Sequence, residues 1–215
     1  FNATATDYLN QQNSSISTRS VTIDTTAPSA VAIVTPTAGF NTTNRTLTIN
    51  ATATDTYLSY INLAIYNSTG SIVNSTNASS SAVNTLLTVG SDGTYTVNAT
   101  AYDYAGNTNT TGVGNVRIDT IGPSSIEYGT GTETTGTNVS RTYLIVNVTA
   151  VDAGGLANIT IRLFNSTQTL INTSVSTSSS YYINFSGLTT QGIYYFNSTA
   201  TDYLNQQNSS ISTST

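Results

Sequence analysis

The sequence predicts an all-β protein made of repeated units. Apolar and polar side chains alternate along residues 47–55 and again along residues 95–103, as expected for strands that bury one face. Turn signals rich in Gly, Asn, Asp and Ser separate such segments, and no segment of useful length has a helical period. Residues 1–18 also recur at 196–213 with a single difference, Ala3 against Ser198, so the chain spans one long unit and an overlap.

The strands expected in the first half of the chain can be placed in order. Leu47, Ile49 and Ala51 face the core in the second strand, and Tyr95 and Val97 face it in the fifth, where Tyr95 resembles a tyrosine corner. In the usual lettering of a sandwich, the expected strands are A at 32–35, B at 46–54, C at 59–66, E at 84–89, F at 93–103 and G at 113–119.

Each long unit divides into two weaker repeats of about 97 residues. Residues 21–29 match 116–124, and residues 50–55 match 147–152. A repeat of about 100 residues with about seven short strands has the size of an immunoglobulin-type β-sandwich. We therefore expect tandem immunoglobulin-like domains in an extended array. Residues 1–24 are the F–G hairpin of a preceding repeat, 25–121 form one domain, and 122–215 form a domain that lacks its own G strand.

Several motifs resemble the tandem Ig-like repeats of large bacterial and archaeal surface and adhesin proteins. They are Ala-Tyr-Asp-Tyr-Ala-Gly-Asn at 101–107, Val-Arg-Ile-Asp-Thr-Ile-Gly-Pro at 116–123, and the runs 148–161 and 187–195. The resemblance covers essentially the whole chain, although Asp-Tyr-Leu-Asn-Gln-Gln at 202–207 departs from the Ala-Gly-Asn turn. It implies a stalk or spacer at the cell surface, outside the cell, and no activity.

The expected gap in the last domain suggests how copies continue into one another. A sandwich without its G strand exposes unpaired backbone on a sheet edge. Continuing chain, or a strand from a further copy of the same repeat, would complete it by β-augmentation. The candidate donor strand consists of Ser20, Val21, Thr22, Ile23 and Asp24.

Glycosylation is the second functional signal. The acceptor pattern Asn-X-Ser/Thr begins at eighteen of the twenty-four Asn residues, and repeat-equivalent positions keep it. Because Ser and Thr are so common here, composition alone also generates such triplets. The candidate sites for covalent N-linked glycans are Asn2, Asn50, Asn67, Asn74, Asn98, Asn147, Asn165, Asn172 and Asn197.

Carboxylates form the one constellation with metal-binding chemistry. In a sandwich of this kind, Asp24, Asp55 and Asp103 converge where the chain enters the first domain, and Asp119, Asp152 and Asp202 repeat the arrangement at the next junction. Six carboxylates at two hinges suit Ca²⁺, which takes oxygen ligands and would stiffen the joints. The alternative is that each Asp simply caps a local turn.

Other functional classes find little support. The net charge is −5, with five scattered Arg and no basic patch for nucleic acid, and no apolar run is long enough to span a bilayer. The chain has no His, Cys or Lys, so it lacks the usual base for a nucleophilic Ser, a thiolate and zinc ligands, and we expect no enzyme. The favoured function is a structural repeat of a glycosylated extracellular filament, stalk or surface coat. The alternatives are an adhesin module that binds a carbohydrate or a partner surface, and an accessory spacer of a carbohydrate-active enzyme.

Overall fold

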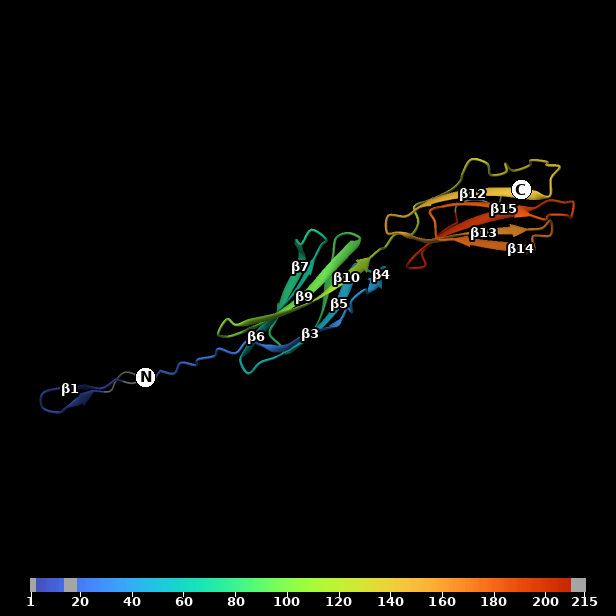
Figure 1. Ribbon diagram of the computed structural model, residues 1–215. Helices are drawn as coiled ribbons and strands as arrows, with labels where there is room; N and C mark the ends of the chain where they lie inside the picture. The colour runs from blue at the N-terminus through green and yellow to red at the C-terminus, as the bar shows by residue number, and fades with distance from the viewer. Residues whose placement is uncertain (1–2, 14–18, 210–215) are drawn as a thin grey trace.

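The computed structural model describes residues 3–13 and 19–209, and every regular element in these ranges is a β-strand. Figure 1 shows a short hairpin, an extended linker and two sandwiches that follow one another along the chain. Each sandwich has its own buried cluster, which includes Ile61 and Leu63 in the first and Ile159 and Ile161 in the second. The predicted fold class, an all-β chain of tandem immunoglobulin-like sandwiches, is confirmed.

The first sandwich consists of two sheets. One has the order β3-β5-β8 and the other β4-β10-β9-β6-β7, and the pairs are antiparallel except that of β4 with β10. Its strands are β3 (Ser29–Thr35), β4 (Asn41–Thr42), β5 (Thr46–Thr54), β6 (Leu58–Tyr66), β7 (Ile72–Ala78), β8 (Ala82–Thr88), β9 (Gly93–Asp103) and β10 (Thr108–Ile118). Strands A, B and E thus face strands C, F and G, and β7 is an additional edge strand beside C.

The second sandwich repeats this plan with a shorter last strand. Its sheets have the orders β11-β12-β15 and β14-β13-β16-β17. The strands are β11 (Ser125–Tyr128), β12 (Tyr143–Val151), β13 (Leu156–Phe164), β14 (Leu170–Ser176), β15 (Ser180–Ser186), β16 (Tyr195–Asp202) and β17 (Gln207–Asn208). The last of them, β17, is the counterpart of β10 and contains only two residues.

The N-terminal hairpin has the same turn as the hairpin of β16 and β17 in the second sandwich. Its strands β1 (Ala5–Thr6) and β2 (Gln12–Asn13) are exposed and pair with each other. The Asp7 carboxylate accepts hydrogen bonds from the backbone N–H of Leu9 and Gln11, at 2.9 and 2.8 Å. The Asp202 carboxylate accepts the same two bonds from Leu204 and Gln206 in the second sandwich, so the identical sequences form the same turn.

The alternating pattern accounts for the cores. Along β5 the alternate residues Leu47, Ile49 and Ala51 are buried, and along β9 the same holds for Tyr95 and Val97. Burial of this kind contributes about 25 cal/mol for each Å² of apolar surface removed from water. The two sheets of each sandwich therefore stay together through apolar contact, without disulfides.

A tyrosine anchors the start of strand F in both sandwiches. The Tyr95 hydroxyl donates to the Ser91 carbonyl at 2.6 Å, and the Tyr194 hydroxyl donates to the Thr190 carbonyl at 2.8 Å. This bond ties the strand to the preceding loop, as in the tyrosine corner of such sandwiches. Tyr95 is almost fully buried, whereas Tyr194 is only partly covered.

Candidate functional site at the inter-domain junctions

The linker before each sandwich is attached to that sandwich by two side chains at equivalent positions of the repeat. The Asn107 Nδ2 donates to the Asp24 carbonyl at 3.3 Å, and the Gln206 Nε2 donates to the Asp119 carbonyl at 3.1 Å. Two residues further along, the Asn109 Nδ2 reaches the Pro28 carbonyl, and the Asn208 Nδ2 reaches the Pro123 carbonyl, both at 2.9 Å. The two junctions therefore repeat with an offset that matches the internal repeat.

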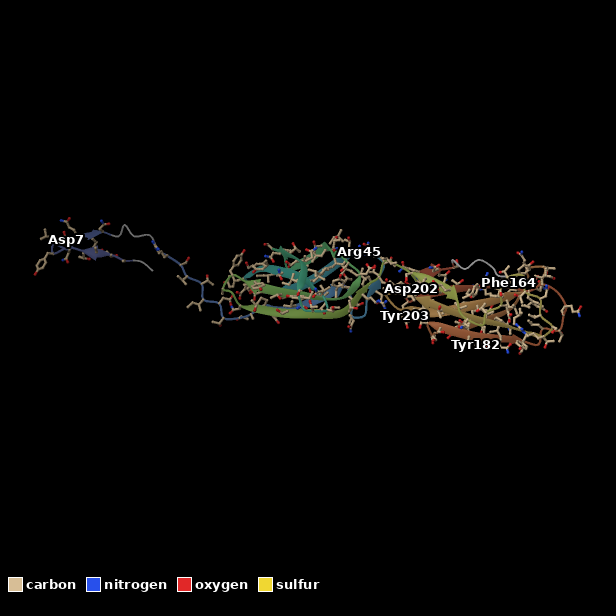
Figure 2. The ribbon with its side chains drawn as sticks, turned by 90° about the horizontal axis from the view of Figure 1, so that it is seen from above. Asp7, Arg45, Phe164, Tyr182, Asp202 and Tyr203 are labelled. Carbon is tan, nitrogen blue, oxygen red and sulfur yellow. The ribbon has the colours of Figure 1, made fainter. Side chains whose placement is uncertain are left out.

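Both neighbouring sandwiches contribute to the second junction. From the first sandwich, Arg45 bonds the Asp92 carboxylate at 3.0 Å, and Asp92 accepts the backbone N–H of the linker residue Thr120 at 2.9 Å. From the second, the ring of Tyr203 lies under the Arg117 guanidinium, with the guanidinium carbon 5.9 Å from the ring centre. Figure 2 shows Arg45, Asp202 and Tyr203 gathered where the two sandwiches meet.

The charges at this junction are mutually compensated. Desolvation raises the pKa of Asp92, but hydrogen bonds from Thr120 and Arg45 and the charge of Arg45 outweigh it, so the pKa lies below its ordinary value. Arg117 also bonds the Asp119 carboxylate at 3.1 Å, and Asp119 is only 4% exposed. Such charged bonds fix the linker direction more effectively than surface ion pairs, whose contribution is small.

Three of the six predicted carboxylates come together at the first junction. One oxygen each from Asp24, Asp55 and Asp103 lies within 4.8 Å of the others. Each of these residues also caps a local turn, because their Oδ1 atoms accept backbone N–H groups. Desolvation raises the pKa of Asp103, yet hydrogen bonds from Asn107 and neighbouring backbone groups outweigh it and leave the pKa below its ordinary value. The Asp103 Oδ2 also accepts a hydrogen bond from the Asn107 Nδ2 at 2.7 Å. Turn capping and convergence are thus both present, and carboxylate oxygens are the ligands that Ca²⁺ takes.

The equivalent carboxylates at the second junction do not gather in this way. In the part of the chain that the structure describes, Asp119, Asp152 and Asp202 form no group of comparable closeness. The expected convergence does not occur because Asp119 forms an ion pair with Arg117, while Asp202 accepts hydrogen bonds from the backbone and side chain of Gln206. Arg117 lies two residues before Asp119 and supplies a positive charge at the second junction. The equivalent residue at the first junction, two residues before Asp24, is the uncharged Thr22.

Calcium binding at the first junction stays a prediction, and titration tests it. Millimolar Ca²⁺ is expected to release measurable heat and to raise the melting temperature of the full chain, because an ion bound only by the folded state stabilises it. Asp55→Asn should abolish both effects, whereas Asp152→Asn at the second junction should leave them unchanged. A wild-type chain that takes up no Ca²⁺ would leave turn capping as the sole role of the three carboxylates.

Among the residues that the structure describes, one sheet edge of the second sandwich is only partly paired. Strand β17 pairs with β16 only at Ala200 and Thr201, whereas β10 runs along β9 from Tyr102 to Gly93. Asn197 lies on the part of β16 that pairs with β13 but not with β17, and its buried Oδ1 has no hydrogen-bond partner among the residues described. Buried polar atoms are nearly always hydrogen-bonded, so the described residues leave one hydrogen-bonding position on this sheet edge unfilled.

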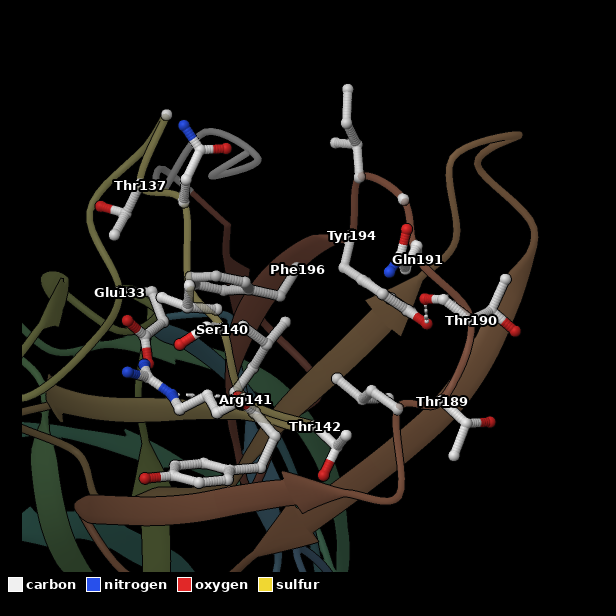
Figure 3. A pocket seen from close by; sticks show the side chains of 18 of the residues that line it. Glu133, Thr137, Ser140, Arg141, Thr142, Thr189, Thr190, Gln191, Tyr194 and Phe196 are labelled. Atoms are coloured by element: carbon white, nitrogen blue, oxygen red, sulfur yellow. Dashed lines mark hydrogen bonds and ion pairs between the residues drawn. The ribbon is translucent and has the colours of Figure 1, made fainter.

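A pocket of about 690 Å³ lies beside this partly paired edge. Figure 3 shows Arg141, Tyr194 and Phe196 lining it. Tyr194 and Phe196 are the counterparts of Tyr95 and Val97, which pair with β10 in the first sandwich. The pocket therefore occupies the place that the second half of a G strand fills in the first sandwich.

The first sandwich shows which residues fill that place. Val116 and Ile118 of β10 are 0% and 1% exposed. The backbone N–H of Arg117 donates to the Phe40 carbonyl at 2.8 Å, and that of Asp119 donates to the Thr42 carbonyl at 3.0 Å. A Val-x-Ile-Asp segment thus closes the end of this sandwich with two core side chains and two backbone bonds.

The predicted donor strand carries the same four-residue pattern and is exposed. Val21 and Ile23 correspond to Val116 and Ile118 in the repeat but are 70% and 88% exposed. Ser20 and Thr22 lie in the same extended segment, and Asp24 belongs to the first junction. The described residues therefore include an exposed segment with the Val-x-Ile-Asp pattern and a pocket at the position that this pattern fills in the first sandwich.

The predicted glycan sites within the described residues fall into four settings. Asn50 and Asn147 lie on the B strands β5 and β12, and Asn98 and Asn197 lie on the F strands β9 and β16. Asn67 and Asn165 lie in the turns after β6 and β13, while Asn74 and Asn172 lie on the edge strands β7 and β14. Asn2 lies outside the described residues.

Comparisons with solved structures place the chain beside other sandwich modules. The fibronectin(III)-like modules of Clostridium thermocellum CbhA are 18% identical, with 85% of this chain and 90% of that one covered and a TM-score of 0.42. A segment of two fibronectin type III domains from chicken tenascin is 13% identical, with coverages of 87% and 99% and a TM-score of 0.37. A structure from a 1.5-MDa bacterial ice-binding adhesin is 15% identical, with coverages of 82% and 59% and a TM-score of 0.41.

No family model and no curated protein matches the sequence. No helix long and apolar enough to cross a bilayer occurs in the ranges that the structure describes. The fold and the repeated junctions thus define a tandem module of immunoglobulin-like sandwiches.

Proposed function

We propose that this chain is a structural spacer, a repeat of a glycosylated extracellular filament, stalk or cell-surface coat. The observation that carries the proposal is the repeated junction, in which Asn107 and Gln206 attach successive linkers through equivalent hydrogen bonds. A linker held in the same way at each repeat gives each added domain the same attachment to the chain segment before it. The function of such an array follows from its length and stiffness.

The chemistry of the chain favours this role over catalysis. Its buried carboxylates among the residues described are Asp103, Asp119 and Asp202, and all three are engaged in turns or linker contacts. General acid–base or nucleophilic catalysis requires groups poised in a cleft. These carboxylates instead hold the backbone at domain ends, as a spacer requires.

Strand donation would join separate copies. The place beside Tyr194 and Phe196 fits the Val21 to Asp24 segment, because the first sandwich holds a Val-x-Ile-Asp segment there. Insertion would bury two exposed apolar side chains, worth roughly 1.5–3 kcal/mol each. It would also pair the free edge of β16, as in β-strand addition. Covalent continuation of the repeat would place a segment of the same pattern at the same site.

Sedimentation of the full chain tests this joining. Wild-type chains are expected to associate end to end as concentration rises, and the double variant Val21→Asp/Ile23→Asp should remain monomeric with unchanged melting of both sandwiches. The matched control is Leu9→Asp, because Leu9 is 79% exposed but lies in the hairpin turn outside the donor segment. Association that persists in the double variant would contradict strand donation.

A further inference from the structure

The turns after the two C strands hold an asparagine in one fixed arrangement. In the first sandwich the Asn67 Oδ1 accepts three hydrogen bonds, from the backbone N–H and the hydroxyl of Thr69 at 3.1 and 2.7 Å and from the Ser71 N–H at 2.9 Å. In the second, the Asn165 Oδ1 accepts the equivalent bonds from Thr167 and Thr169 at 3.1, 2.8 and 2.9 Å. The turn is therefore reproduced in full in both repeats.

This arrangement uses the carbonyl side of the amide and leaves its nitrogen available. Neither Asn67 nor Asn165 donates a hydrogen bond from Nδ2 to any residue within 3–13 or 19–209. The three residues that follow Asn67 are exposed, and the two that follow Asn165 are as well. A group attached to Nδ2 can thus extend into solvent while the three bonds to Oδ1 remain in place.

Three other acceptor sequences are engaged through their nitrogen, at Asn74, Asn109 and Asn147. The Asn147 Nδ2 donates to the Thr130 carbonyl at 3.1 Å, and a Cβ built on Gly129 would lie only 2.7 Å from it. The Asn74 Nδ2 donates to the Thr88 carbonyl at 2.8 Å. At Asn109 the nitrogen holds the first linker, so a sugar there would compete with the junction itself.

Asn98 is crowded in a different way. It pairs across the sheet with Gly112, and a Cβ built on that glycine would lie 2.5 Å from the Asn98 Oδ1. The Oδ1 side of this amide therefore lies close to the backbone of the neighbouring strand. A sugar on it would need the space that this close strand contact occupies.

We propose that Asn67 and Asn165 are glycan attachment sites of the folded chain. This deepens the proposed function, on whose glycosylated surface it rests. In the transfer, Nδ2 forms a bond to the anomeric carbon of a nucleotide- or lipid-activated sugar. The phosphate leaving group departs with the electrons of the broken C–O bond, and a base of the transferase takes the Nδ2 proton. One glycan per domain then recurs at the same turn along the array.

Enzymatic glycosylation of the folded chain tests this selection. The unglycosylated full chain is incubated with a purified soluble N-glycosyltransferase and nucleotide-activated glucose, and the modified residues are mapped by peptide mass spectrometry. Asn67 and Asn165 are expected to be modified, and Asn98, Asn109 and Asn147 to remain free. The heat-unfolded chain, in which all of these sequences are accessible, serves as the positive control.

Two variants make the result specific. Thr69→Ala removes the acceptor pattern and should abolish modification at Asn67 while leaving Asn165 modified; Ser71→Ala keeps the pattern and should leave both modified. Modification of Asn147 or Asn109 in the folded chain, or none at Asn67 and Asn165 when the unfolded chain is modified there, would overturn the assignment. Neither outcome depends on end-to-end association, which sedimentation measures separately.

Discussion

Replacing Gly154 by alanine is expected to uncouple the two sandwiches. Gly154 follows β12, and a Cβ there would lie 1.7 Å from the Asp119 Oδ2 and 2.3 Å from its Cγ. Asp119 is buried and bonded to Arg117, so its carboxylate has little freedom to move aside. The second sandwich must therefore shift away from the linker and lose the bond from Gln206 to the Asp119 carbonyl. Each such hydrogen bond contributes about 1 kcal/mol.

Residual dipolar couplings measure this effect directly. In the wild-type chain one alignment tensor should describe both sandwiches, and Gly154→Ala should require two, with the folded signals of each domain retained. Gly90→Ala is the matched control, because nothing lies within 4 Å of a Cβ at Gly90. A Gly154→Ala chain still described by one tensor would show that this contact does not fix the junction.

Replacing Ile118 by alanine is expected to destabilise the first sandwich by about 2–5 kcal/mol, the usual effect of truncating a buried Ile. Ile118 is 1% exposed and ends β10, where its backbone pairs with both Gly93 and Thr42. The loss combines the removed apolar contact with the cavity left behind. Denaturant unfolding, followed separately for each domain by amide signals, measures the difference.

The repeat provides a matched comparison for this substitution. Ile23 occupies the equivalent position in the sequence but is 88% exposed, so Ile23→Ala should change domain stability by less than about 0.5 kcal/mol. The difference between the two stability changes thus distinguishes the segment that is paired in the sandwich, around Ile118, from the exposed segment around Ile23. Similar losses at both positions would contradict the exposed state of the donor segment.

Much of the fold could be predicted because the core-facing residues alternate. The period of two at Leu47 and Ile49 and the tyrosine at Tyr95 correspond to buried strands in the structure. The edge strands β7 and β14 were missed, since both are largely exposed and carry no continuous apolar stripe. An edge strand is defined by pairing with a neighbour, which a single segment of sequence does not reveal.

The candidate site could be predicted in part. Asp24, Asp55 and Asp103 end strands or begin a linker, and the topology of the sandwich alone brings them together. The second trio failed for a reason visible only in three dimensions, because the Arg117 side chain reaches Asp119. Likewise, the sequence treats all Asn-X-Ser/Thr patterns alike, whereas backbone hydrogen bonds and close strand contacts distinguish Asn67 from Asn147.

The central claim is that the joints between the sandwiches are fixed and repeat along the chain. The most direct test of it is the distance between two spin labels, one on each sandwich. The chain has no cysteine, so Leu86→Cys and Tyr182→Cys, at positions 64% and 58% exposed, would place one spin label on each domain. A rigid junction predicts a single narrow distance distribution in the double variant, broadened when Gly154→Ala is added. A broad distribution without Gly154→Ala, typical of domains on a flexible tether, would contradict the account.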